Sequence, residues 1–222
     1  MQVLQYCKTS AGKLYFRRHS TRAGVIAPAG VSSKKQHIVS AAISAFILRL
    51  CRWKIEGSFD KQLPKVVLIL VPHTSNWDFP LAVLVRATTR SDIKFAAKSS
   101  LFRPPFGWLF RWLGGYPVER SKSTNYVQAM TDVFNRHQKF HLVITPEGTR
   151  KKVDQLKTGF YYIALGAGAA IVMCSFDYEK RVVKWREPFY PTGNKDLDFQ
   201  VIDRFFKNAK GRRPELGYLY EA

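Results

Sequence analysis

The sequence contains little cysteine and few acidic residues. Its three cysteines, Cys7, Cys51 and Cys174, lack metal-ligand spacing and cannot all pair, which indicates a reducing compartment without a disulfide framework. Only 16 Asp and Glu oppose 36 Lys and Arg, so the formal net charge is +20 at pH 7. Because such a field attracts anions, nucleic acid, an anionic membrane surface and phosphorylated small molecules are all candidate partners.

A long apolar run is also missing. The most apolar helical pattern, Ile38–Ile55, is continuous over about a dozen residues, well short of the ~20 that cross a bilayer. Arg49, Arg52 and Trp53 near its end favour a helix lying in the membrane interface, and packing on the domain core is the alternative. No Gly-x-Ser-x-Gly elbow is present to supply a hydrolase nucleophile.

The length and charge pattern predict one main domain with an N-terminal extension. Residues 1–37 read as a basic, flexible tail, too broken by Gly and Pro for a signal peptide. Residues 38–60 read as an interfacial helix and hinge, and residues 61–222 as the main domain. In this last part strand-like and helix-like patterns alternate, which predicts the α/β class.

The clearest chemical signal follows the apolar run Val66–Val71, which predicts a buried strand. Pro72 ends this strand, His73 comes next, and Asp78 opens a helical pattern that runs to about Thr89. A histidine acts as a general base when an acceptor holds its second ring nitrogen. We therefore interpret His73 and Asp78 as a catalytic pair, although a strand cap and a helix cap would give the same spacing.

Polar residues also follow two later predicted strands. Arg120 comes just after Tyr116–Val118, and the segment Pro146-Glu-Gly-Thr-Arg150 comes after Phe140–Thr145. Ligands bind at the strand ends of α/β sheets, so these groups should meet His73 around one crevice. The forked donors of Arg120 and Arg150 suit a phosphate, and Thr149 adds a hydroxyl. Gly148 lets the backbone approach a ligand, and we expect Glu147 to orient an arginine or the loop.

Three ordered motifs, His73-x4-Asp78, Gly115-x4-Arg120 and Pro146-Glu-Gly-Thr-Arg150, resemble those of the glycerolipid acyltransferases over roughly residues 64–177. The resemblance implies transfer of a fatty acyl group from acyl-CoA or acyl-ACP to a lysophospholipid hydroxyl, with 1-acyl-glycerol-3-phosphate as the expected acceptor. It makes His73 the base and Asp78 its partner. The implied substrate-binding residues are Lys98, Arg120, Glu147, Gly148, Thr149 and Arg150.

By the same resemblance the fold should be a mixed central β-sheet flanked by helices, with a short N-terminal helical element on the membrane. The reaction needs no metal, bound cofactor or covalent intermediate, since a thioester is already activated. The expected location is the cytoplasmic face of a membrane, peripheral or monotopic. The alternatives are a basic nucleic-acid-binding protein, for which no recognised motif is present, and an acyltransferase with a different acceptor.

Overall fold

The computed structural model describes residues 34–118 and 123–218, which form an α/β fold around one seven-stranded sheet. Its strand order is β1-β7-β6-β2-β5-β3-β4, and every neighbouring pair is parallel except the antiparallel β6 and β7. The predicted mixed sheet is therefore confirmed. The strands are β1 (Lys54–Glu56), β2 (Lys65–Leu70), β3 (Ile93–Lys98), β4 (Gly115–Val118), β5 (Phe140–Ile144), β6 (Ala170–Asp177) and β7 (Val182–Trp185).

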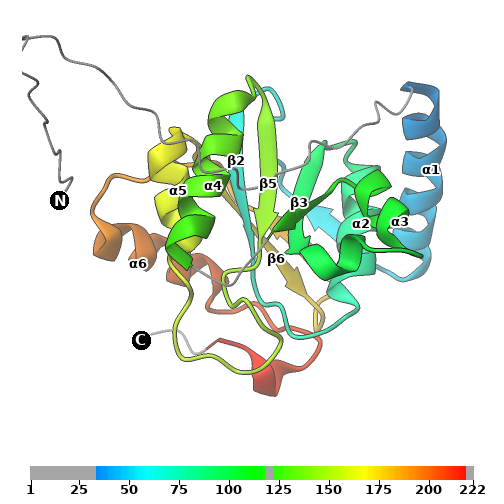
Figure 1. The fold of residues 1–222 in the computed structure, drawn as a ribbon. Helices are drawn as coiled ribbons and strands as arrows, with labels where there is room; N and C mark the ends of the chain where they lie inside the picture. The colour runs from blue at the N-terminus through cyan, green and yellow to red at the C-terminus, as the bar shows by residue number, and fades with distance from the viewer. Residues whose placement is uncertain (1–33, 119–122, 219–222) are drawn as a thin grey trace, which may run out of the picture.

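Helices cover both faces of the sheet, as Figure 1 shows: α4, α5 and α6 lie on one side, and α1, α2 and α3 on the other. Two short 3-10 turns, Ser99–Phe102 and Pro214–Leu216, complete the described elements. The helices are α1 (Lys34–Leu50), α2 (Asp78–Thr88), α3 (Gly107–Trp112), α4 (Ser123–Arg136), α5 (Gly159–Ala167) and α6 (Lys195–Phe206).

Strand β2 lies at the centre of the sheet and is buried on both faces. Val67 and Ile69 belong to the core beneath α4, α5 and α6, whereas Val66 and Leu68 belong to the core beneath α1 and α2. This two-sided burial explains why the strand reads as a continuous apolar run instead of an alternating one. It also fixes the end of β2, and with it the start of the turn that carries His73.

The predicted helix Ile38–Ile55 is wrong over its last turn. Helix α1 ends at Leu50, Arg52 adopts a positive φ of 60°, and the Trp53 N–H donates to the Leu48 carbonyl at 2.8 Å. The chain then enters β1, which pairs in parallel with β7. Pairing with a strand more than 120 residues away overrides the local helical pattern, and no periodicity within three residues could have revealed it.

Helix α1 has one buried and one exposed face. Ala41 and Leu48 are buried where the helix packs on α2, whereas Phe46 and Leu50 are about two thirds or more exposed, at 67% and 71%. The interpretation that this helix packs on the core thus concerns its buried face, and the interpretation that it lies in a membrane interface concerns its exposed face. Within the described part of the chain, no helix is both long enough and apolar enough to cross a bilayer.

The two leucines of α1 provide a matched test of this arrangement. Leu48→Ala should lower the free energy of unfolding by about 2–4 kcal/mol, because it leaves a cavity in the core. Leu50→Ala, the same chemical change on the exposed face, should alter it by less than about 0.5 kcal/mol. Urea unfolding of the two variants measures both values, and equal losses would contradict the assignment of faces.

Candidate active site

His73 and Asp78 meet in the turn between β2 and α2, residues 71–77, which we call the His73 turn. The His73 Nδ1 lies 2.9 Å from the Asp78 Oδ2. The Asp78 side chain is 1% exposed, while the imidazole is 20% exposed. A buried carboxylate thus holds one ring nitrogen, and the ring itself reaches the surface. This is the arrangement that the spacing of the two residues predicts.

Asp78 receives two further hydrogen bonds. The Ser75 N–H donates to Oδ2 at 3.0 Å, and the hydroxyl of Tyr178 donates to Oδ1 at 2.8 Å. Burial raises the pKa of Tyr178 and its bond to Asp78 raises it further, so the phenol stays protonated and keeps donating. Because an ionised carboxylate only accepts, we assign the proton of the neutral His73 ring to Nδ1, which makes Nε2 the basic nitrogen.

Glu147 reaches the His73 turn from the end of β5, the neighbour of β2. Its Oε2 accepts the His73 N–H at 2.7 Å, and its Oε1 is buried with no hydrogen-bond partner among the described residues. Desolvation raises the pKa of Glu147 to about 7, and the nearby Asp78 charge adds to this, while the His73 N–H opposes it. Glu147 therefore contacts the His73 turn, a contact that the sequence did not predict, and its expected task of orienting an arginine or its own loop stays a prediction.

The other predicted residues that the structure describes lie at the end of β3 or in the loop after β5. Thr149 accepts the Lys151 N–H at 3.3 Å, and the Arg150 side chain is exposed. Lys98 ends β3, one strand beyond β5, where it is exposed and no described residue bonds to its ammonium. Arg120 lies outside the described residues.

Lys157 joins the loop after β5, although the sequence did not single it out. Gly148 has a positive φ of 66°, and a Cβ on it would lie 2.7 Å from the Lys157 Nζ. The space that the glycine leaves is thus taken by the end of an exposed lysine side chain. The loop after β5 consequently presents four exposed cations, Arg150, Lys151, Lys152 and Lys157, beside the buried Glu147.

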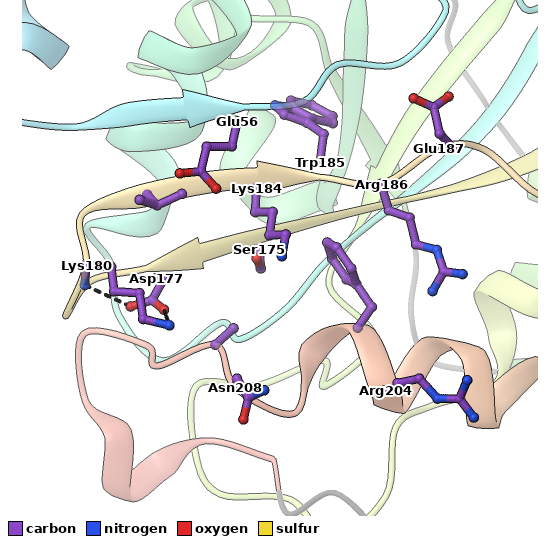
Figure 2. A pocket seen from close by; sticks show the side chains of 13 residues that line it. Glu56, Ser175, Asp177, Lys180, Lys184, Trp185, Arg186, Glu187, Arg204 and Asn208 are labelled. Atoms are coloured by element: carbon purple, nitrogen blue, oxygen red, sulfur yellow. Dashed lines mark hydrogen bonds and ion pairs between the residues drawn. The ribbon is translucent and has the colours of Figure 1, made fainter.

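A cavity of about 590 Å³ lies against the β6–β7 hairpin and α6 (Figure 2). Its lining mixes acidic and basic groups, and Asp177 there pairs with Lys180 at 3.7 Å. Neither His73, Asp78 nor Glu147 lines it, so it is separate from the catalytic pair. Other lining residues include Ser175, Lys184, Arg204 and Asn208.

Comparison with known proteins identifies the family to which the chain belongs. The family model described as Acyltransferase matches residues 54–177, more than half of the chain. The chain therefore belongs to the acyltransferase family and is an acyltransferase.

Among solved structures, the 1-acyl-sn-glycerophosphate (LPA) acyltransferase PlsC from Thermotoga maritima is similar in fold. It is 16% identical, with a TM-score of 0.54, and the match covers 77% of this chain and 78% of that one. A comparison with curated protein sequences gives no match.

The raised pKa of Glu147 predicts a pH-dependent stability. Between its ordinary pKa of 4.5 and about 7, the folded protein keeps a proton that the unfolded chain has lost. The free energy of unfolding therefore falls as the pH rises through this window, and Glu147 contributes about 3 kcal/mol to this fall. Glu147→Gln should lack this component, because an amide does not titrate and can still accept the His73 N–H. Urea unfolding at several values between pH 5 and 8 measures the difference, and parallel curves for the two proteins would contradict it.

Proposed function

We propose that this acyltransferase moves a fatty acyl group from acyl-CoA or acyl-ACP to the hydroxyl of a lysophospholipid, with 1-acyl-glycerol-3-phosphate as the acceptor. The observation that carries the proposal is the 2.9 Å contact between the His73 imidazole and the buried Asp78. It leaves one basic nitrogen at the surface of the site. Membership of the acyltransferase family supplies the class of reaction.

In the proposed mechanism, Nε2 of His73 takes the proton of the acceptor hydroxyl while the oxygen attacks the thioester carbonyl. The tetrahedral intermediate then expels the thiolate, the carbon–sulfur bond breaks, and the imidazolium returns its proton to the sulfur. Asp78 stabilises the imidazolium and keeps the ring oriented. General-base catalysis of this kind contributes about 10²–10⁴-fold, and positioning of the substrates contributes at least as much.

The acceptor phosphate is assigned to the cations after β5. Arg150 offers two parallel donors to phosphate oxygens, and Lys157 adds a second positive charge next to Gly148. Arg120 follows β4 in the sequence and is proposed as a further ligand of the phosphate by its motif. Lys98 remains a proposed contact on the same substrate-binding side.

Substitution of the base tests the mechanism. His73→Ala should lower kcat by about 10²–10⁴-fold with the fold retained, because it removes proton transfer and leaves the binding groups in place. His137→Ala is the matched control, since His137 bonds to the Val133 carbonyl at the opposite, amino-terminal edge of β5 and should leave kcat unchanged.

The assay uses a labelled acyl donor and a panel of lysolipids, with the products identified by mass. Near wild-type turnover of His73→Ala would contradict the assignment of the base. Formation of product only on an acceptor without phosphate would contradict the proposed lysophosphatidate specificity.

We further propose that the enzyme acts at an anionic membrane surface, as a peripheral or monotopic protein of the cytoplasmic face. The proposed contact is the set of exposed apolar side chains on α1, on α3 and on the segment just before α3. Helix α1 packs on α2, the Phe110 ring of α3 lies 6.2 Å from the Phe79 ring of α2, and all three helices lie on one side of the sheet (Figure 1). The exposed Arg49, Arg103 and Arg111 accompany it and suit lipid phosphates. The surface consists of Ile43, Phe46, Leu50, Leu101, Phe106, Trp108 and Trp112, which are 46–71% exposed.

Vesicle binding tests this surface. Phe46→Ser combined with Trp108→Ser should reduce sedimentation with phosphatidylglycerol vesicles at least about tenfold, because both apolar side chains would insert into the interface. Leu197→Ser removes a comparably exposed apolar side chain from α6 and should leave binding unchanged. Equal binding by all three proteins would contradict the proposal.

A further inference from the structure

A basic segment that follows α6 lies directly on the His73 turn. We call this segment, Lys210–Arg213, the basic loop. The Arg213 N–H donates to the Thr74 Oγ1 at 3.1 Å, and the Tyr178 N–H donates to the Lys210 carbonyl at 2.8 Å. The basic loop is thus hydrogen-bonded both to the His73 turn and to Tyr178, whose hydroxyl donates to Asp78.

The approach of the two segments is close enough to need glycine in the basic loop. A Cβ at Gly211 would lie 2.5 Å from the Thr74 Oγ1 and 3.2 Å from the Pro72 Cγ. Contacts below 3.0 Å require backbone or side-chain movement, so Gly211 is required for this packing. Residues more than 130 positions apart in the sequence are therefore fixed against each other at the catalytic pair.

Arg212 is held over an exposed ring of the same turn. Its guanidinium carbon lies 5.0 Å from the ring centre of Trp77, and this indole is 58% exposed. Trp77 directly precedes Asp78, and the positive charge of Arg212 also lowers the pKa of Tyr178, against the larger effect of burial. The guanidinium is consequently close to the hydrogen-bonded group of His73, Asp78 and Tyr178.

Among the residues that the structure describes, the charge of Arg212 has no ionic partner. None of the ion pairs between described residues includes Arg212, whereas the neighbouring Lys210 is paired with Glu179 at 2.8 Å. An aromatic face positions a guanidinium without consuming its N–H groups, which stay free to bind a phosphate through two parallel hydrogen bonds. The two carboxylates nearest to His73, Asp78 and Glu147, are buried and do not compete for it.

We propose that Arg212, positioned by Trp77, forms a phosphate-binding subsite beside the His73 turn. The subsite is distinct from the Arg150 and Lys157 cations after β5. This proposal rests on the proposed function. The subsite binds a phosphate of one of the two substrates, either the phosphate monoester of the acceptor or the diphosphate of coenzyme A. Two separate phosphate subsites would match a reaction in which both substrates carry phosphate.

Steady-state kinetics with paired substrates distinguish the two sources. Arg212→Gln should raise the KM for one phosphorylated substrate about tenfold, because one charge-assisted phosphate contact is lost, and should change kcat less than about twofold. If coenzyme A is the ligand, the KM for acyl-CoA rises and that for the phosphate-free acyl-pantetheine does not. If the acceptor is the ligand, the KM for 1-acyl-glycerol-3-phosphate rises and that for the corresponding monoacylglycerol does not.

Lys139→Gln is the matched control for charge. It removes the same unit of charge from an exposed residue just before β5, at the opposite edge of the sheet, and should leave every KM unchanged. Urea unfolding of Arg212→Gln should be close to wild type. A KM within twofold of wild type for both phosphorylated substrates would overturn the proposal.

Measurement of ligand binding tests the subsite independently of turnover. Calorimetric titration with coenzyme A and with 1-hexanoyl-glycerol-3-phosphate should give a Kd about tenfold weaker for Arg212→Gln with one of the two ligands. If the wild-type protein binds in this Arg212-dependent manner and transfers no acyl group, the proposed function fails and the subsite stands. If turnover is observed and neither the KM nor the Kd depends on Arg212, the subsite fails and the proposed function stands.

Discussion

The buried carboxylate of Asp78 is the group on which the candidate site depends. It accepts hydrogen bonds from the imidazole of His73, the N–H of Ser75 and the hydroxyl of Tyr178. A carboxylate that is 1% exposed is costly to ionise unless such donors surround it. In this way one side chain ties the His73 turn, the start of α2 and the end of β6 together.

The sheet order explains how these donors come together. Strand β2 lies between β6 and β5, and all three run in parallel, so the segments after them meet at one edge. Tyr178 therefore reaches the His73 turn from one neighbour and Glu147 from the other. Buried carboxylates sit at the centre of this edge and cations at its rim, including Arg150 and Arg212. An anionic substrate can thus be attracted to the rim while the base next to Asp78 stays oriented.

Much of this arrangement could be predicted from the sequence, because apolar runs and strand-end residues are local signals. The pair His73 and Asp78 and the loop containing Glu147 were found in this way. Tyr178 and Arg212 were not, since they lie 100 or more positions from the turn that they contact and only the tertiary fold brings them there. Strand β1 was missed for the same reason, because its three residues form a strand only by pairing with β7.

The most direct test of the account is the position of the proton on the His73 ring. Nitrogen-15 spectra of protein labelled in histidine, assigned with His73→Gln, distinguish a protonated ring nitrogen from an unprotonated one. At pH 8 we expect Nδ1 of His73 to carry the proton and to donate it to Asp78, and we expect Nε2 to be unprotonated so that it can serve as the base. In Asp78→Asn the proton should move to Nε2, because an amide can donate to Nδ1. A proton on Nε2 in the wild-type protein would contradict the account.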